Sequence, residues 1–148
     1  MKLTTKGKFA VTAMIDIAIN SKGRPITLQM ISERQSISVS YLEQLFVKLR
    51  RNGMVKSYKG PGGGYTLGKN GLEIKISEIV KAVDENLDAR NCGGNKNCRG
   101  GNKQCLTHDL WSNLTEHMYN YLQTIKLADL VYNDKQKLTK INQINQIN

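Results

Sequence analysis

The chain has 148 residues, of which 39% are hydrophobic and 6% aromatic, and its formal net charge is +10. This length fits one ordinary domain, or a small domain with an appendage, and it allows a modest hydrophobic core. No segment is both long and apolar enough to cross a bilayer, which excludes a membrane-spanning protein.

The positive charge is concentrated in the N-terminal half. Residues 1–72 contain 12 Lys and Arg against 3 acidic residues, whereas residues 73–148 contain 10 against 9. A basic half of this kind is typical of proteins that bind a polyanion, most often nucleic acid. The alternative is a solvated basic surface with no specific partner.

The first predicted element is a helix over residues 5–20. Its apolar residues recur at helical spacing on one face, which holds Phe9, Ala10, Ala13, Met14, Ile17 and Ala18. The segment faintly resembles a signal peptide, but Asp16 interrupts the apolar run and no clean cleavage site follows. We therefore expect the chain in the reducing cytoplasm, where an odd number of cysteines also argues against a disulfide framework.

A short helix at about 28–35, a tight link at 36–37 and a third helix at about 39–51 follow. Ser38 or Ser40 is expected to cap the third helix, since Ser40 and Glu43 have capping-box spacing, and Gly53 occupies a C-cap position. Residues 55–58 and 65–67 predict two strands joined by the GPGGG turn. This order of elements predicts a winged helix-turn-helix over residues 1–75.

Residues 76–133 form a second predicted region. We expect a helix at about 77–86 capped by Ser77, a cysteine-containing loop at 90–106, a long helix from His108 that Thr107 can cap, and a short helix at about 126–133. The apolar positions of the long helix are Leu110, Trp111, Leu114, Met118, Tyr121, Leu122 and Ile125. This stripe either forms a dimer interface or packs on the chain's own core, and the pattern leaves both open.

The last residues, 134–148, repeat Ile-Asn-Gln and are expected to be a disordered polar tail. The predicted fold class is mostly α with a small β-wing. It consists of a winged helix-turn-helix followed by a long helix that is suited to dimerisation.

Candidate DNA-binding residues lie at the start of the third helix, the end that enters the major groove in helix-turn-helix proteins. Gln44 can bond to adenine, Glu43 can accept from cytosine, and Ser40 can bond to either. Phosphate contacts are expected from neighbouring side chains, namely Ser38, Tyr41 and Lys48. The alternative is a capped helix that only faces solvent.

The predicted wing supports DNA binding, because lysines flank its glycine-rich turn. Lys59 can reach a minor groove there, although an ordinary flexible hairpin would also explain the glycines. The following GGYTLGKN nearly matches a phosphate-binding loop of NTPases. However, Asn70 replaces the expected Ser or Thr and the strand lies inside the motif, so we expect no NTPase and no enzyme.

The remaining chemistry is gathered in one segment, with the spacing Cys92-x5-Cys98-x6-Cys105-x2-His108. Structural zinc sites mostly use C-x2-C pairs, whereas these gaps are long, glycine-rich and nearly repeated. Such loops can surround something larger than one ion, and thiolates are the main ligands of iron–sulfur clusters. The spacing favours a cluster, with a zinc site or reactive thiols as alternatives.

The segments MKLTTKGKFAVTAMIDIA, ISERQSISVSYLEQLFVKLRRNGMV, KGPGGGYTLGK and CLTHDLW closely resemble the IscR family of bacterial iron–sulfur cluster regulators, and the match runs to about residue 132. The resemblance implies a homodimeric transcription factor on palindromic double-stranded DNA. It also implies a [2Fe–2S] cluster, supplied by the cluster-assembly machinery and held by Cys92, Cys98, Cys105 and His108. In this family the cluster-bound form represses the cluster-assembly operon, and the cluster-free form acts at a second class of sites.

The resemblance further implies base contacts by Ser40, Glu43 and Gln44 and wing contacts near Lys59 and Pro61. Two positions depart from the family pattern: the gap between the second and third cysteines is one residue longer, and Lys59 stands where the family has Arg. The related alternatives are a nitric-oxide-sensing cluster regulator of the same fold and a zinc-stapled nucleic-acid-binding module. A thiol redox enzyme is disfavoured because no C-x-x-C motif is present.

Overall fold

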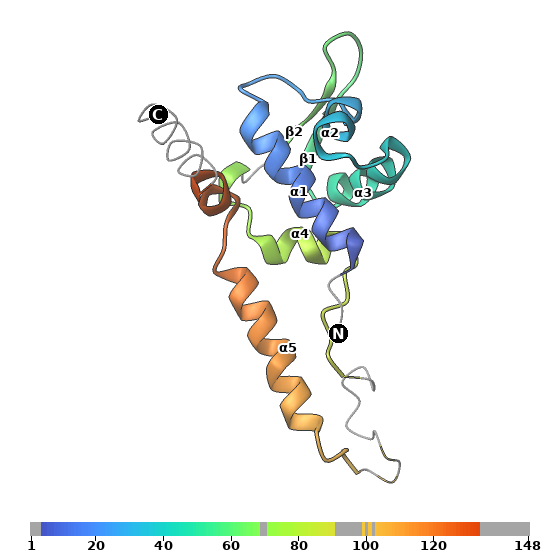
Figure 1. Cartoon of the computed structure of the whole chain (residues 1–148), viewed down its shortest axis with the longest axis vertical. Helices are drawn as coiled ribbons and strands as arrows, with labels where there is room; N and C mark the ends of the chain where they lie inside the picture. The colour runs from blue at the N-terminus through green and yellow to red at the C-terminus, as the bar shows by residue number, and fades with distance from the viewer. Residues whose placement is uncertain (1–3, 69–70, 91–98, 100, 102, 134–148) are drawn as a thin grey trace, which may run out of the picture.

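The computed structural model describes residues 4–68, 71–90, 99, 101 and 103–133. Two of the predicted metal ligands, Cys92 and Cys98, and the predicted tail at 134–148 lie outside these residues. The elements, shown in Figure 1, are α1 (Thr5–Asn20), α2 (Leu28–Gln35), α3 (Val39–Arg51), β1 (Val55–Tyr58), β2 (Gly64–Leu67), η1 (Gly71–Glu73), α4 (Ile76–Ala82) and α5 (His108–Gln123). Residues 127–133 are also helical.

Helix α1 lies at the centre of the body and is packed against α2, α3, α4 and β2. The predicted apolar face is largely buried, and Ala10, Ala13, Met14 and Ile17 are fully inaccessible to solvent. The core continues into α3 through Leu42, Leu45, Phe46 and Leu49. The predicted winged helix-turn-helix is therefore confirmed, and its hydrophobic core positions the functional elements.

The two strands form an antiparallel hairpin in which Val55 pairs with Leu67 and Tyr58 with Gly64. Strand β2 begins at Gly64, one residue before the predicted start, and its Tyr65 also forms a bridge with Ile26. A side chain at Gly64 would meet the backbone oxygen of Ile26 at 2.6 Å, so this close approach requires glycine. The hairpin is thereby fixed to the link between α1 and α2.

Of the two candidate caps for α3, Ser38 is confirmed and Ser40 is not, and both the predicted cap and the predicted end of α4 were wrong. Ser38 caps α3, with its Oγ accepting from the Tyr41 amide at 3.2 Å, whereas Ser40 lies inside the first turn. Helix α4 begins at Ile76, so Ser77 is a buried helical residue rather than a cap. The same helix ends at Ala82 instead of residue 86, because Asp84 adopts a left-handed conformation with φ 56°.

Helix α5 begins at His108, as predicted, and runs away from the helical body (Figure 1). Its C-terminal part packs on the core through Met118, Tyr119 and Leu122, and Ile125, two residues after the helix, packs there as well. Its N-terminal part instead exposes Leu110 (58%) and Trp111 (37%). Part of the apolar stripe thus packs on the chain's own core, whereas Tyr121 (65%) is exposed like Leu110 and Trp111, and dimerisation stays a prediction.

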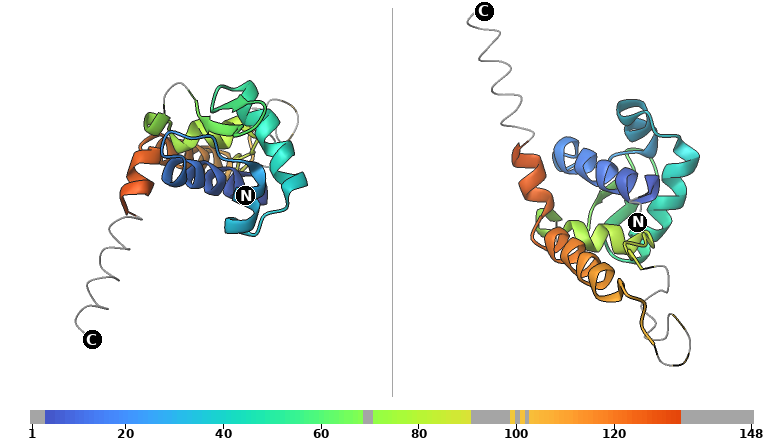
Figure 2. Two further views of the ribbon diagram at one scale, coloured as in Figure 1. Left: turned by 90° about the horizontal axis from the view of Figure 1, so that it is seen from above. Right: turned by 60° about the horizontal axis from the view of Figure 1, so that its bottom comes forward.

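After α5 the chain returns to the body. Ile76 donates its amide to the Ile125 carbonyl at 2.9 Å, and Leu127 donates to the Ile74 carbonyl at 2.9 Å. Both views in Figure 2 show residues 127–133 beside α1, where Leu127 is fully buried. This return fixes the C-terminal end of α5 to the start of α4.

Candidate DNA interface and cluster site

The recognition helix α3 presents a polar outer face. The apolar residues of α3 point into the core, which leaves Ser40, Glu43 and Gln44 exposed. Tyr41 is only partly exposed, because its ring stacks edge-on against Phe9 with centroids 5.7 Å apart. The three predicted base-reading residues therefore share one solvent-facing surface, while Tyr41 joins that surface to α1.

A buried ionic contact holds the first helix of the motif in place. The Asp16 side chain in α1 has no exposed surface and accepts two hydrogen bonds from the Arg34 guanidinium, at 2.7 and 3.0 Å. Gln35 donates a third at 2.8 Å. Burial alone would raise the pKa of Asp16, but these hydrogen bonds and the charge of Arg34 outweigh it and lower the pKa below 3.8.

The wing projects from the end of the body opposite α5 (Figure 1). Both predicted wing residues, Lys59 and Pro61, are exposed at its tip. A Cβ at Gly63 would lie 2.4 Å from the Tyr58 carbonyl oxygen, so the tight return of the chain depends on glycine. The lysine is therefore presented on a compact turn rather than on a long loop.

Lys48, the last predicted DNA-binding residue of α3, already has an anionic partner. Its Nζ lies 2.9 Å from Asp84 Oδ2, in the segment that follows α4. The next residue, Glu85, is 5% exposed and accepts from the amide of Thr4 at 3.2 Å and that of Gly7 at 2.7 Å. Glu85 thus supplies a cap for the N-terminus of α1 from a distant part of the sequence.

The described part of the cluster site is the start of α5. Cys105 is partly exposed and His108 is 8% exposed. The two residues are joined by a backbone hydrogen bond from the His108 amide to the Cys105 carbonyl, 3.1 Å long. Among the described residues no three His, Cys, Asp or Glu side chains gather as a metal site, since the other two expected ligands lie outside them.

The donor set fits an iron–sulfur cluster. A thiol and an imidazole are both ligands of such clusters, and the short turn between them places both at the N-terminus of a 16-residue helix. That end carries the positive end of the helix dipole, which favours an anionic group beside it. The residues present are therefore compatible with the cluster that the sequence indicates.

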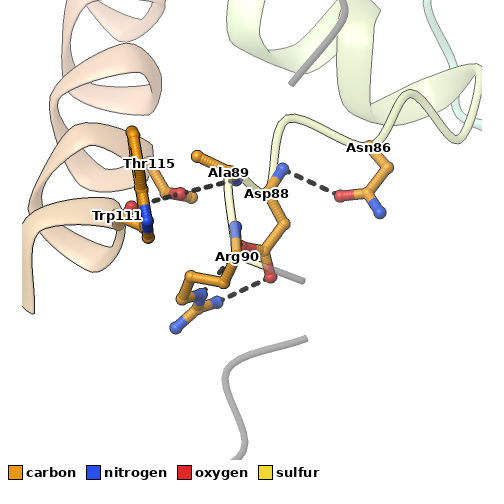
Figure 3. A network of polar contacts seen from close by, with 6 residues as sticks. All are labelled: Asn86, Asp88, Ala89, Arg90, Trp111 and Thr115. Atoms are coloured by element: carbon orange, nitrogen blue, oxygen red, sulfur yellow. Dashed lines mark hydrogen bonds and ion pairs between the residues drawn. The ribbon is translucent and has the colours of Figure 1, made fainter. Parts of the chain in front are cut away.

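A polar network connects α5 with the segment that precedes the cysteines (Figure 3). The Ala89 amide donates to Thr115 Oγ1 at 2.9 Å, and that hydroxyl donates to the Trp111 carbonyl at 2.8 Å. Next to Ala89, the Arg90 side chain holds the Asp88 carboxylate at 2.7 and 2.8 Å and lowers the pKa of Asp88 to about 2. The chain leaving the body is thus fixed against α5 before it reaches Cys92.

Sequence reasoning missed Asp84, Glu85 and Thr115. The predicted helix over 77–86 placed two acidic residues in its last turn, where they oppose the helix dipole. That conflict was a usable signal that the helix ends earlier and that the carboxylates have other partners. Thr115 is 8% exposed and lies beside the apolar stripe of α5, and the sequence carries no signal for its contact with Ala89.

The comparisons with known proteins agree with this architecture. The Rrf2 family, described as iron-dependent transcriptional regulators, matches residues 3–133. The HTH-type transcriptional regulator IscR of Klebsiella pneumoniae (strain 342) is 54% identical over 135 residues, which cover 91% of this chain and 82% of the relative. The IscR protein of Escherichia coli O1:K1 is 53% identical over 135 residues, with 91% and 83% covered. These relatives are named as transcriptional regulators, so the chain is not an enzyme.

Solved structures of transcriptional regulators share the fold of this chain. T. potens IscR matches with a TM-score of 0.74 and 32% identity, covering 93% of this chain and 90% of that one. CymR, the global cysteine regulator of B. subtilis, also reaches a TM-score of 0.74, with 28% identity and 89% and 97% covered. Within the described residues no helix is long and apolar enough to span a membrane. The chain therefore belongs to the Rrf2 family of DNA-binding helix-turn-helix transcriptional regulators, and within it to the IscR type.

Proposed function

We propose that this regulator senses iron–sulfur cluster status through a [2Fe–2S] cluster and controls cluster-assembly and related genes. It acts as a homodimer on palindromic double-stranded DNA and receives its cluster from the cluster-assembly machinery. It works in the cytoplasm and is associated with the nucleoid when bound to DNA.

The observation that carries the proposal is the position of Cys105 and His108. His108 is both a candidate ligand and the first residue of α5, with its side chain almost completely buried. Cys92 and Cys98 follow the segment that Ala89 fixes to α5. Two of the candidate ligands thus lie at the start of α5, and the other two follow in sequence a segment fixed to α5. A [2Fe–2S] cluster held by these four ligands would supply a redox-active group whose presence reports cluster supply.

The candidate DNA-binding residues of α3 and the wing have two different roles. Ser40, Glu43 and Gln44 carry the donors and acceptors that read base edges in the major groove. Lys48, Lys59 and the basic N-terminal half attract the phosphate backbone without reading sequence. Pro61 stiffens the wing tip beside Lys59, and Ser38 and Tyr41 add hydroxyl groups near the helix start.

Ligation and DNA binding are coupled through the junction between α4 and α5. When all four ligands are engaged, Cys92 and Cys98 hold the segment after Arg90 near the start of α5, where Leu110 and Trp111 are exposed for a second copy. The chain that leads to this segment starts at Asp84 and Glu85, which contact α3 and α1. A coupling free energy of about 1–3 kcal/mol changes DNA occupancy by about 5- to 150-fold.

Anaerobic purification followed by visible absorbance and metal analysis tests the proposal. We expect a red-brown protein with about two irons per chain and no stoichiometric zinc, because the four ligands hold one two-iron cluster. Replacing Cys105 by Ala should remove the colour while the circular dichroism of the helices stays unchanged. A colourless wild-type protein with one zinc per chain, or a protein with four irons per chain, would contradict the proposed cluster.

A further inference from the structure

A basic depression of 130 Å³ lies between α1 and α3, beside the base-reading face. It is lined by Lys6, Tyr41, Gln44, Leu45 and Lys48. The side chains of two lysines, a tyrosine and a glutamine thus line one small concave surface, together with the apolar side chain of Leu45. Such a set of donors suits an anionic oxygen group such as a phosphate.

One residue, Asp84, engages both lysines of this depression. Its carboxylate accepts from Lys48 Nζ at 2.9 Å, and its backbone carbonyl accepts from Lys6 Nζ at 3.2 Å. The hydrogen bond from Lys48 also holds the pKa of the Asp84 carboxyl below its ordinary value of 3.8. In the DNA-free chain, both cations are therefore directed at oxygens of the same residue.

The backbone around Asp84 is firmly held, whereas its carboxylate is 73% exposed. Glu85 is bound to the start of α1, and the Asn52 side-chain amide donates to the Ala82 carbonyl at 3.3 Å. An exposed ion pair of this kind is weak, because water competes for both partners. A stronger or multiply charged anion can consequently replace the carboxylate without disturbing the fold.

We infer that the depression between α1 and α3 binds a phosphate of the DNA backbone, and that Asp84 is a built-in competitor that occupies Lys48 until DNA arrives. The inference deepens the DNA-binding part of the proposed function and rests on it. A phosphodiester shares its single negative charge between two non-bridging oxygens, so each of Lys6 and Lys48 can meet a charged oxygen, whereas Asp84 offers Lys48 a carboxylate and Lys6 a neutral carbonyl. Asp84 therefore lowers the affinity for every DNA sequence and does not select among bases.

Asp84 also lies on the chain that leads to the cysteines. The segment from Asp84 to Arg90 joins the recognition helix at one end and Thr115 of α5 at the other. Asp84 is thus connected through residues 84–90 to the candidate cluster site and through Lys48 to the proposed phosphate contact.

The test uses the full-length chain and measures its affinity for 30-base-pair duplexes of several sequences over a range of salt concentrations. Asp84→Asn keeps a residue type that tolerates the left-handed conformation but removes the charge. We expect this variant to bind every duplex about two- to fivefold more tightly, the range of an exposed ion pair. Lys48→Gln should weaken binding, and combining it with Asp84→Asn should abolish the gain.

The matched control is Glu73→Gln. Glu73 forms an equally exposed ion pair with Lys126, far from α3, and its substitution makes the same change in net charge. A gain for Asp84→Asn no larger than that of Glu73→Gln, or one that persists when Lys48 is Gln, would overturn the inference. If Asp84→Asn lowers the melting temperature, Lys6→Gln tests the phosphate contact instead. Loss of one phosphate contact should reduce by about one the slope of the logarithm of DNA affinity against the logarithm of salt concentration. Wild-type protein that binds no duplex at all would instead refute DNA binding itself.

Discussion

At the scale of single residues, the buried Asp16 carboxylate of α1 holds helix α2 in place through its ion pair with Arg34. Asp16→Asn leaves the Arg34 guanidinium without an anionic partner. We expect the free energy of unfolding at neutral pH to fall by about 1–3 kcal/mol, the cost of an unsatisfied buried hydrogen-bonding group. Urea denaturation measures this change, and Glu116→Gln on the exposed side of α5 serves as a control.

The pH dependence of this contribution follows from the lowered pKa of Asp16. The stabilisation is fully present above the unfolded-state value of 3.8 and is lost as the pH falls through the lower folded-state pKa. The difference between wild type and Asp16→Asn should therefore shrink in strong acid. A difference that stays constant from neutral pH to acid would show that the charge of Asp16 is not what stabilises α2.

Glu43 carries a different expectation, because its carboxylate faces solvent on the recognition helix. A carboxylate near phosphates is unfavourable unless a cytosine amino group meets it. We expect Glu43→Ala to relax discrimination between DNA sites by about 1–3 kcal/mol while phosphate-driven binding persists. Competition binding between matched and mutated duplexes measures this, and complete loss of DNA binding would mean that Glu43 is structural.

At the scale of elements, some apolar side chains of α5 pack on the core and others are exposed to solvent. The exposed part includes Leu110 and Trp111 at its N-terminal end. If a second copy covers this surface, Leu110→Glu buries a charge in the interface and should weaken dimerisation by at least about tenfold. Sedimentation equilibrium measures the dissociation constant.

Asn113→Glu is the matched control for that variant. Asn113 is exposed on the same helix, so the substitution adds the same charge away from the apolar stripe. Equal effects of the two substitutions would mean that charge alone, and not the apolar surface, controls association. A wild-type chain that stays monomeric at high concentration would refute the dimer directly.

The boundaries of the elements also show what could be predicted from sequence. Helices α1 to α3 begin and end where periodicity, caps and breakers placed them, because those signals are local. Helix α5 begins at the predicted His108 but ends at Gln123, two residues before the predicted Ile125. Helix α4 ends early for a reason that is not local. Glu85 bonds to Gly7, 78 positions away, and this tertiary contact outweighs continuation of the helix.

At the scale of the whole molecule, the sequence indicated both functional sites but not the link between them. The recognition helix, the wing and the start of α5 were identified by motif and resemblance, since each is a continuous stretch of chain. The contacts of Asp16 with Arg34 and of Ala89 with Thr115 join residues far apart in the sequence. Side-chain patterns on single elements carry no information about such pairs, so only the fold could reveal them.

We propose that occupancy of the cluster site changes which DNA this regulator binds. Selection from a random-sequence duplex library under anaerobic conditions tests it most directly, with cluster-loaded wild type compared against the Cys105→Ala variant. We expect both proteins to select palindromes, because the winged helix-turn-helix is intact in each, but to rank them differently by about five-fold or more in affinity. Identical palindromes bound with identical affinities by the two proteins would contradict the account.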